Sequence, residues 1–145
     1  MPTIFDPAAR AGLMTRVGAL APEAPRRWGR MDAPLMLAHL TEALRMATGD
    51  LPIAPRGGPL SWPPVRHAII HWLPFPKGAP TAPELLSRAA VDFDVERRQL
   101  AGLLERVAAP AHTFGAHPAF GTLSREDWGV LIYRHMDNHL RQFSA

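Results

Sequence analysis

The range 124–143 most constrains the fold of this chain, because it has the pattern of one long helix whose inward face changes character along its length. Ser124 followed three residues later by Asp127 forms a capping box, with Asp in place of the usual Glu or Gln. At about 100° per residue, one face begins apolar and then turns polar, through Trp128, Leu131, Ile132, His135, Met136, Asn138, His139, Gln142 and Phe143. Burying polar side chains without partners costs free energy, so this face predicts a buried hydrogen-bonded network or a metal site.

Two histidines on this face, His135 and His139, lie at positions i and i+4. They therefore stack one turn apart and can bind one ion together. A third histidine, His39, falls within an apolar stripe of another helical segment. A lone histidine on an apolar face is more often a hydrogen-bonded core residue than a ligand. Three imidazoles with one open position, however, form a standard catalytic metal set.

Three further long helices are predicted from their start and stop signals. The first runs over about 7–20 and begins at Asp6-Pro7. The second lies between Asp32 and Gly49, and the third runs from about Asp94 to the break at 109–110. Its expected outer face is charged and includes Glu96. No strand-like alternation and no internal repeat is visible, so the sequence predicts an all-α, single-domain four-helix bundle over 1–145.

A long Pro- and Gly-rich connection, 50–82, separates the second and third long helices and suggests a crossover or lid over one end of the bundle. It contains a short helical or extended piece, 65–73, in which His67 and His71 are also four residues apart. This pair could hold a metal, but the piece is short and bounded by prolines. Ile69, Ile70 and Trp72 instead favour a cover that packs on the bundle, which is the interpretation we adopt.

Composition excludes several classes of function. The net charge is only +3, and the sixteen basic residues, of which only Lys77 is a lysine, are scattered among acidic ones, which argues against nucleic-acid binding. No apolar run reaches about 18 residues and no signal pattern opens the chain, so we expect a cytoplasmic protein without a membrane span. The absence of cysteine excludes disulfides, thiolate ligands and a cysteine nucleophile.

Three blocks of sequence resemble the DinB-like (YfiT-type) superfamily, in particular a branch of small bacterial proteins. They are RWGRMDAPLMLAHL, LPFPKGAPTAPEL and HPAFGTLSREDWGVLIYRHMDNHLRQF, and the resemblance extends over about 5–143. It implies an up-up-down-down-type four-helix bundle that binds a divalent ion, zinc or nickel, through His39, His135 and His139. One departure is Asn138, where relatives in this branch often have histidine.

The resemblance and the residues together favour a metal-dependent enzyme that acts on a small molecule by hydrolysis or thiol S-transfer. Glu42, close to His39 in sequence, is a candidate general base or a partner that orients an imidazole, although it can equally be a solvated residue on the shoulder of its helix. Asn138 and Gln142 are candidates to orient the histidines or a substrate. The alternative is a non-catalytic bundle that binds a small ligand or a partner chain, with the histidines as a polar core.

An expectation about assembly also follows from the resemblance, because members of the superfamily are often homodimers. Leu37 and Leu44 lie on the back of the second helix, away from His39. They are expected either to be buried against a neighbouring helix or to form a dimer contact.

Overall fold

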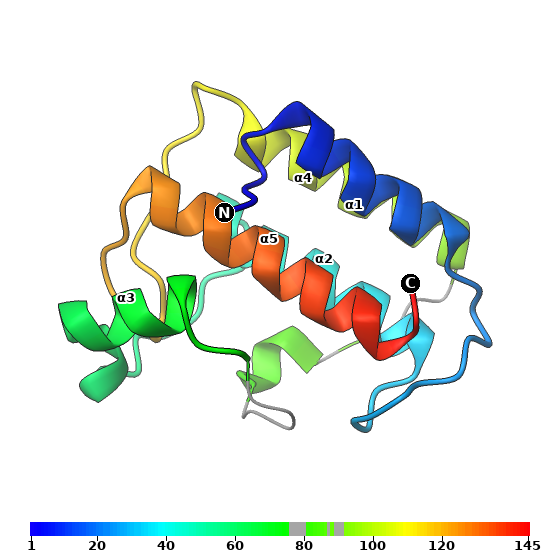
Figure 1. Ribbon diagram of the computed structural model, residues 1–145, viewed down its shortest axis with the longest axis horizontal. Coiled ribbons are helices and arrows are strands. Elements are labelled where there is room, and N and C mark those ends of the chain that lie inside the picture. Colours follow the sequence, from blue (N-terminus) through cyan, green and yellow to red (C-terminus); the bar gives the residue numbers. More distant parts are fainter. Residues whose placement is uncertain (76–80, 87, 89–91) are drawn as a thin grey trace.

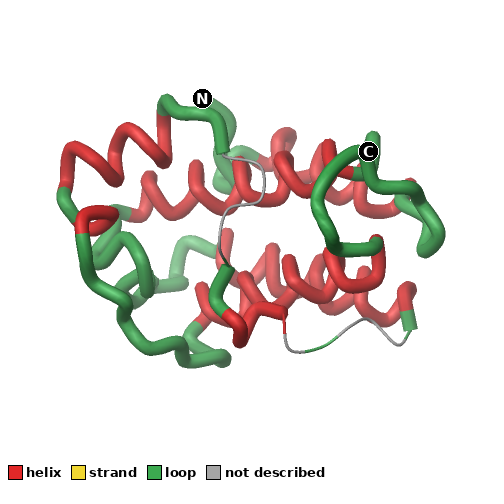
Figure 2. The backbone as a smooth tube through the Cα atoms, turned by 90° about the horizontal axis from the view of Figure 1, so that it is seen from below, coloured by secondary structure: helices red, strands yellow, loops and turns green. Residues whose placement is uncertain are grey.

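The computed structural model describes residues 1–75, 81–86, 88 and 92–145, and this part of the chain is all-helical. Its α-helices are α1 (Pro7–Ala19), α2 (Ala33–Thr48), α3 (Pro63–His71), α4 (Phe93–Ala108) and α5 (Arg125–Gln142). Two short 3-10 helices, η1 (Pro59–Ser61) and η2 (Pro83–Leu86), flank α3 in sequence. The described residues contain no strand, and Figure 2 shows every regular segment as helix. The prediction of an all-α fold is confirmed.

The four long helices begin at residues whose side chains cap them. The side chains of Asp6, Asp32 and Ser124 each accept a hydrogen bond from a backbone N–H in the first turn of the helix that follows. Gly49 ends α2 in the left-handed conformation, with φ of 87°. The third long helix, predicted from about Asp94, begins at Phe93 and is capped by the side chain of Asp92.

The four long helices pack side by side in pairs (Figure 1). In that view α1 and α5 lie in front, with α4 behind α1 and α2 behind α5. Helix α1 contacts both α5 and α4, helix α2 contacts both α4 and α5, and the short α3 packs against α5. The apolar faces enclose one core, built mainly from Leu13, Val17, Met36, Leu40, Leu100, Leu104, Val107, Trp128, Met136 and Leu140. Among the described helices, none combines the length and the apolar character needed to cross a membrane.

Several predicted surfaces differ from what the structure shows. Leu37 and Leu44 are buried within the single chain, which is the first of the two alternatives given for them and leaves them unavailable for a dimer contact. Glu96, predicted on the charged outer face of α4, is only 4 % exposed because it packs towards α2 and pairs there with an arginine. In the short piece expected to cover the core, Ile70 is buried as predicted, whereas Trp72 is 73 % exposed. The part of the long connection at 76–80 lies outside the described residues.

Candidate metal centre

Three histidine rings meet between α2 and α5. His39 comes from α2, and His135 and His139 come from successive turns of α5. One ligand nitrogen of each ring lies within 4.8 Å of the others, and the Nε2 atoms of His39 and His135 are 3.0 Å apart. The ring centroids are separated by 4.8 to 5.0 Å, with the planes between 74° and 86° to one another. The structure therefore brings together the three residues that the sequence singles out as ligands.

The position of the triad follows from the patterning of the two helices. His39 is 1 % exposed and lies in the stripe that also buries Met36 and Leu40. The apolar first half of α5, including Trp128, is buried in the same core, which fixes the rotation of α5 and turns its polar second half towards His39. His135 and His139 remain half-buried. One side of the cluster is thus enclosed by α2, and the α5 side is closer to solvent.

In two of the rings, the outer nitrogen, which is the Nδ1 atom facing away from the cluster, makes a hydrogen bond. His39 Nδ1 lies 3.2 Å from the carbonyl oxygen of Leu85 in η2. A carbonyl can only accept, so His39 Nδ1 carries the proton and Nε2 is left with a lone pair facing the cluster. His139 Nδ1 lies 3.0 Å from Oε1 of Gln142, whose amide nitrogen donates to the carbonyl oxygen of Trp28 at 2.8 Å. This second bond fixes the orientation of the Gln142 amide, so His139 donates from Nδ1 and its Nε2 is also free to bind an ion.

Gly29 makes room for the Gln142 side chain. It adopts φ of 86°, a left-handed conformation that favours glycine. A side-chain carbon at this position would collide with the amide nitrogen of Gln142. The loop that follows Trp28 is therefore shaped around the residue that orients His139.

The three imidazoles are held in their neutral form. The pKa of His39 is lowered from 6.5 to about 4, first by burial and then by the neighbouring His139, while the hydrogen bond to Leu85 opposes the change. Burial, followed by the charges of its histidine neighbours, places the pKa of His135 well below 6.5. Burial also lowers the pKa of His139, against the effect of its hydrogen bond to Gln142. Neutral imidazole is the form that binds a metal ion, so the site is ready for one at neutral pH.

The donor set fits a divalent transition-metal ion. Ligands about 2.1 Å from a tetrahedral zinc are roughly 3.4 Å from one another, a little more than the 3.0 Å between the Nε2 atoms of His39 and His135. Imidazole donors suit zinc and nickel alike. Three protein ligands would leave a fourth position for water or a substrate atom.

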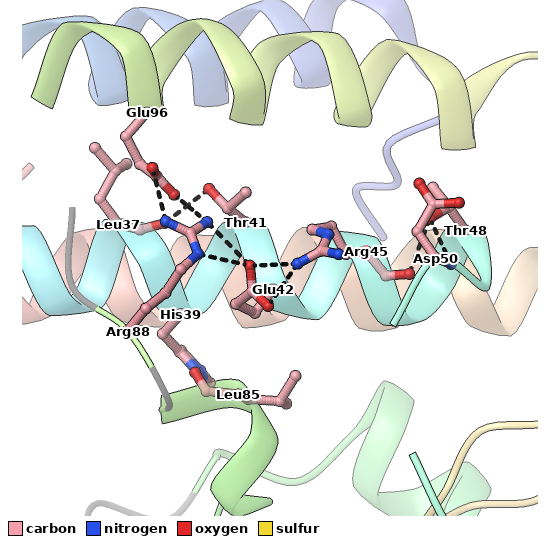
Figure 3. Close-up of polar contacts among 10 residues, drawn as sticks. All are labelled: Leu37, His39, Thr41, Glu42, Arg45, Thr48, Asp50, Leu85, Arg88 and Glu96. Atoms are coloured by element: carbon pink, nitrogen blue, oxygen red, sulfur yellow. Dashed lines mark hydrogen bonds and ion pairs between the residues drawn. The ribbon is translucent and has the colours of Figure 1, made fainter. Parts of the chain in front are cut away.

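Glu42 is not part of this cluster. It is 2 % exposed, and its carboxylate accepts from Arg88 Nε at 2.9 Å and from Arg45 Nη1 at 3.0 Å. Arg88 also binds Glu96 of α4, at 2.6 Å. Figure 3 shows this ion-pair group on one side of α2, while His39 points to the other side, towards Leu85. The carboxylate is thus buried rather than a solvated shoulder residue, and in the described part of the chain its partners are Arg45 and Arg88 rather than an imidazole.

The two other predicted site residues behave differently from each other. Gln142 orients His139, as expected for one of the two roles considered for it. Asn138 is half-buried, and its side chain makes no hydrogen bond within the described part of the chain. Sequence reasoning missed Leu85, which acts through a backbone carbonyl and so leaves no side-chain signal. It also missed Gly29. Only its position in a loop next to Trp28 could have pointed to a role for this glycine.

The family comparison matches the second half of the chain. The model of a family described as "Protein of unknown function (DUF1569)" covers residues 67–145, more than half of the length. The matched region includes α4 and α5 and most of their connections, and with them His135 and His139, while His39 precedes it. Searches of curated proteins and of solved structures found no match. The chain belongs to the DUF1569 family.

Proposed function

We propose that this protein binds one divalent transition-metal ion, zinc or nickel, through His39, His135 and His139 and is a metal-dependent enzyme acting on a small molecule. The observation that carries the proposal is the convergence of three neutral imidazoles, one from α2 and two from α5. Two of the rings have the outer nitrogen bound to an acceptor, so a lone pair of each is directed inward. This arrangement of metal ligands backed by hydrogen-bond acceptors is typical of metal sites.

The reaction class follows from the open position. A bound ion of this kind supplies Lewis-acid chemistry, either by lowering the pKa of a water or thiol ligand or by polarising a carbonyl. The protein contributes the fixed geometry of the imidazoles, of which His135 and His139 are half-buried. Hydrolysis and thiol S-transfer both fit this site, since each needs an activated nucleophile or a polarised acceptor. Glu42 has no part in the proposal, because Arg45 and Arg88 occupy its carboxylate.

We further propose that the chain is a DinB-like four-helix bundle, formed by α1, α2, α4 and α5. The side-by-side packing of these helices supports this assignment (Figure 1). So does the origin of the three histidines, one on the second helix and two on the last, which is the distribution that the resemblance implies.

One observation favours a second candidate, a non-catalytic bundle with a polar histidine core. The 3.0 Å between the Nε2 atoms of His39 and His135 is also a hydrogen-bond distance. If His135 carries its proton on Nε2, it can donate to His39 without any ion. In this candidate the cluster would specify the packing of α2 on α5, and no metal would be needed.

Activity measurements with loaded protein test the enzymatic proposal. Chelator-treated protein is reconstituted with Zn²⁺ or Ni²⁺ and assayed on a panel of hydrolysable esters and amides and on thiol donors paired with electrophiles. The expected result is an activity that requires the ion and is lost in His39→Ala, while His112→Ala, which changes a histidine outside the cluster, retains it. A metal-independent activity, or one unchanged in His39→Ala, would contradict the proposal.

A further inference from the structure

A second group of metal-binding side chains lies where α3 packs on α5. His67 and His71 stand one turn apart on α3, and Asp127 stands in the first turn of α5. One ligand atom of each lies within 4.8 Å of the other two. His71 Nε2 is 2.7 Å from Asp127 Oδ1, and the two histidine rings have centroids 4.5 Å apart. Asp127 precedes His135 by eight residues along α5, about 12 Å, so this group is separate from the first histidine cluster.

The helix contacts hold these side chains in place. Ile70 of α3 is buried in the core, and Arg134 of α5 donates to the backbone carbonyl oxygens of Ile69 and Ile70 at 2.8 and 2.6 Å. On the α5 side, the backbone N–H of Asp127 donates to the Ser124 hydroxyl at 3.0 Å, in the helix cap. Both helices are thus also held by contacts other than the one between His71 and Asp127.

The chemistry of the group suits a divalent transition-metal ion. Two imidazoles and one carboxylate are donors that zinc, nickel and related ions accept. An aspartate carboxylate is ionised at neutral pH, so Asp127 offers a charged oxygen donor. His67 is exposed and His71 and Asp127 are half-buried, so an ion can enter from solvent and keep water ligands. The 2.7 Å between His71 and Asp127 has to widen to roughly 3.4 Å, a small shift for half-buried side chains.

We propose that His67, His71 and Asp127 form a second, solvent-accessible site for a divalent transition-metal ion. An ion bound there connects α3 to α5. It replaces the direct hydrogen bond between His71 and Asp127 by two coordination bonds and recruits His67. The carboxylate can only accept, so His71 Nε2 carries the proton of that hydrogen bond. When Nε2 binds the ion, this proton is released to solvent or the ring is protonated at Nδ1 instead. Because His71 and Asp127 lie 56 residues apart in sequence, the ion binds the folded chain in preference to the unfolded one and stabilises the packing of α3.

Zinc titration of the full-length, tag-free, chelator-treated protein tests this site. Calorimetry is carried out on the wild type, His67→Ala and, as a control, His112→Ala, each with and without His135→Ala to remove the first cluster. The expected result is that His67→Ala binds about one Zn²⁺ fewer than its parent in either background, whereas His112→Ala binds the same number. His67 is exposed, so its replacement leaves the fold intact. Equal zinc numbers for His67→Ala and its parent would overturn the proposal.

The role of the carboxylate is tested separately with Asp127→Asn. A direct ligand should contribute at least as much as an outer partner, so the zinc affinity of this site is expected to fall by about tenfold or more. An unchanged affinity, in protein whose circular dichroism shows an intact fold, would mean that the histidine pair alone binds the ion and would overturn the three-ligand site. Failure of the first cluster to bind metal would appear as no effect of His135→Ala, and it is therefore distinguished from failure of this site.

Discussion

Gln142 Oε1 lies 3.0 Å from His139 Nδ1, and the same amide is anchored by its nitrogen to the carbonyl oxygen of Trp28. Gln142→Leu removes the acceptor that orients His139, so we expect metal affinity to fall by about 10- to 100-fold. A competition titration against a chromophoric chelator measures this change. Asn138→Ala is the matched control on the same helix. It should leave the affinity unchanged, and equal losses for both variants would contradict the role given to Gln142.

Gly29 and Gly49, which both adopt a left-handed backbone conformation, provide a paired test of the loop beside Gln142. Gly29→Ala introduces about 1–2 kcal/mol of backbone strain and also displaces the Gln142 amide, so both stability and metal affinity should fall. Gly49→Ala introduces similar strain at the end of α2, where nothing lies close to the added carbon. It should therefore lower the midpoint of thermal unfolding without weakening metal binding. A Gly29→Ala variant that loses only stability would show that Gln142 finds another position.

Arg88 connects two buried carboxylates. The side chains of Glu42 and Glu96 are 3 % and 5 % exposed, and Arg88 binds both. Arg88→Met leaves Glu96 without its partner and should lower the free energy of unfolding by about 3 kcal/mol, because a buried charge is left uncompensated. Urea denaturation measures this loss. Adding Glu96→Gln to Arg88→Met should restore part of the lost stability. As a control, Arg98→Met, at an exposed position of α4, should lower stability only slightly. Equal losses of stability in the two arginine variants would contradict the role of Arg88.

The buried His117 should make the stability of the protein depend on pH. Its Nδ1 accepts from the backbone N–H groups of Ala119 and Phe120, and burial lowers its pKa from 6.5 to about 4. Between these two pH values the unfolded chain binds a proton that the folded chain does not, so stability falls as the pH falls from 6.5 to 4. The loss from this residue is up to about 3 kcal/mol. His117→Asn, which keeps an acceptor but does not titrate, should show a shallower fall than the wild type in urea denaturation at stepped pH. Parallel curves would contradict this prediction.

The sequence predicts the helices and the His135–His139 pair for physical reasons that are local, whereas the approach of His39 to this pair depends on the packing of α2 against α5. Caps such as Asp32 and Gly49 mark helix ends within a few residues, and the spacing of His135 and His139 places both on one face. The role of Glu42 was not predictable in this way. From its position on α2, the Glu42 side chain could face either the histidines or α4. Only the packing of α4 against α2 decides which of the two it faces. The same holds for Asp127, which reaches His71 only because α3 docks on α5.

Metal content measured by elemental analysis tests the central metal site most directly. Two tag-free variants are compared. The first is His67→Ala, which leaves the triad as the metal site, and the second combines His67→Ala with His135→Ala. We expect about one zinc or nickel per chain in the first protein and essentially none in the second. His112→Ala added to the first should change nothing. Equal metal contents in the first two proteins, or no metal in either after reconstitution with Zn²⁺ and Ni²⁺, would contradict binding of the ion by His39, His135 and His139.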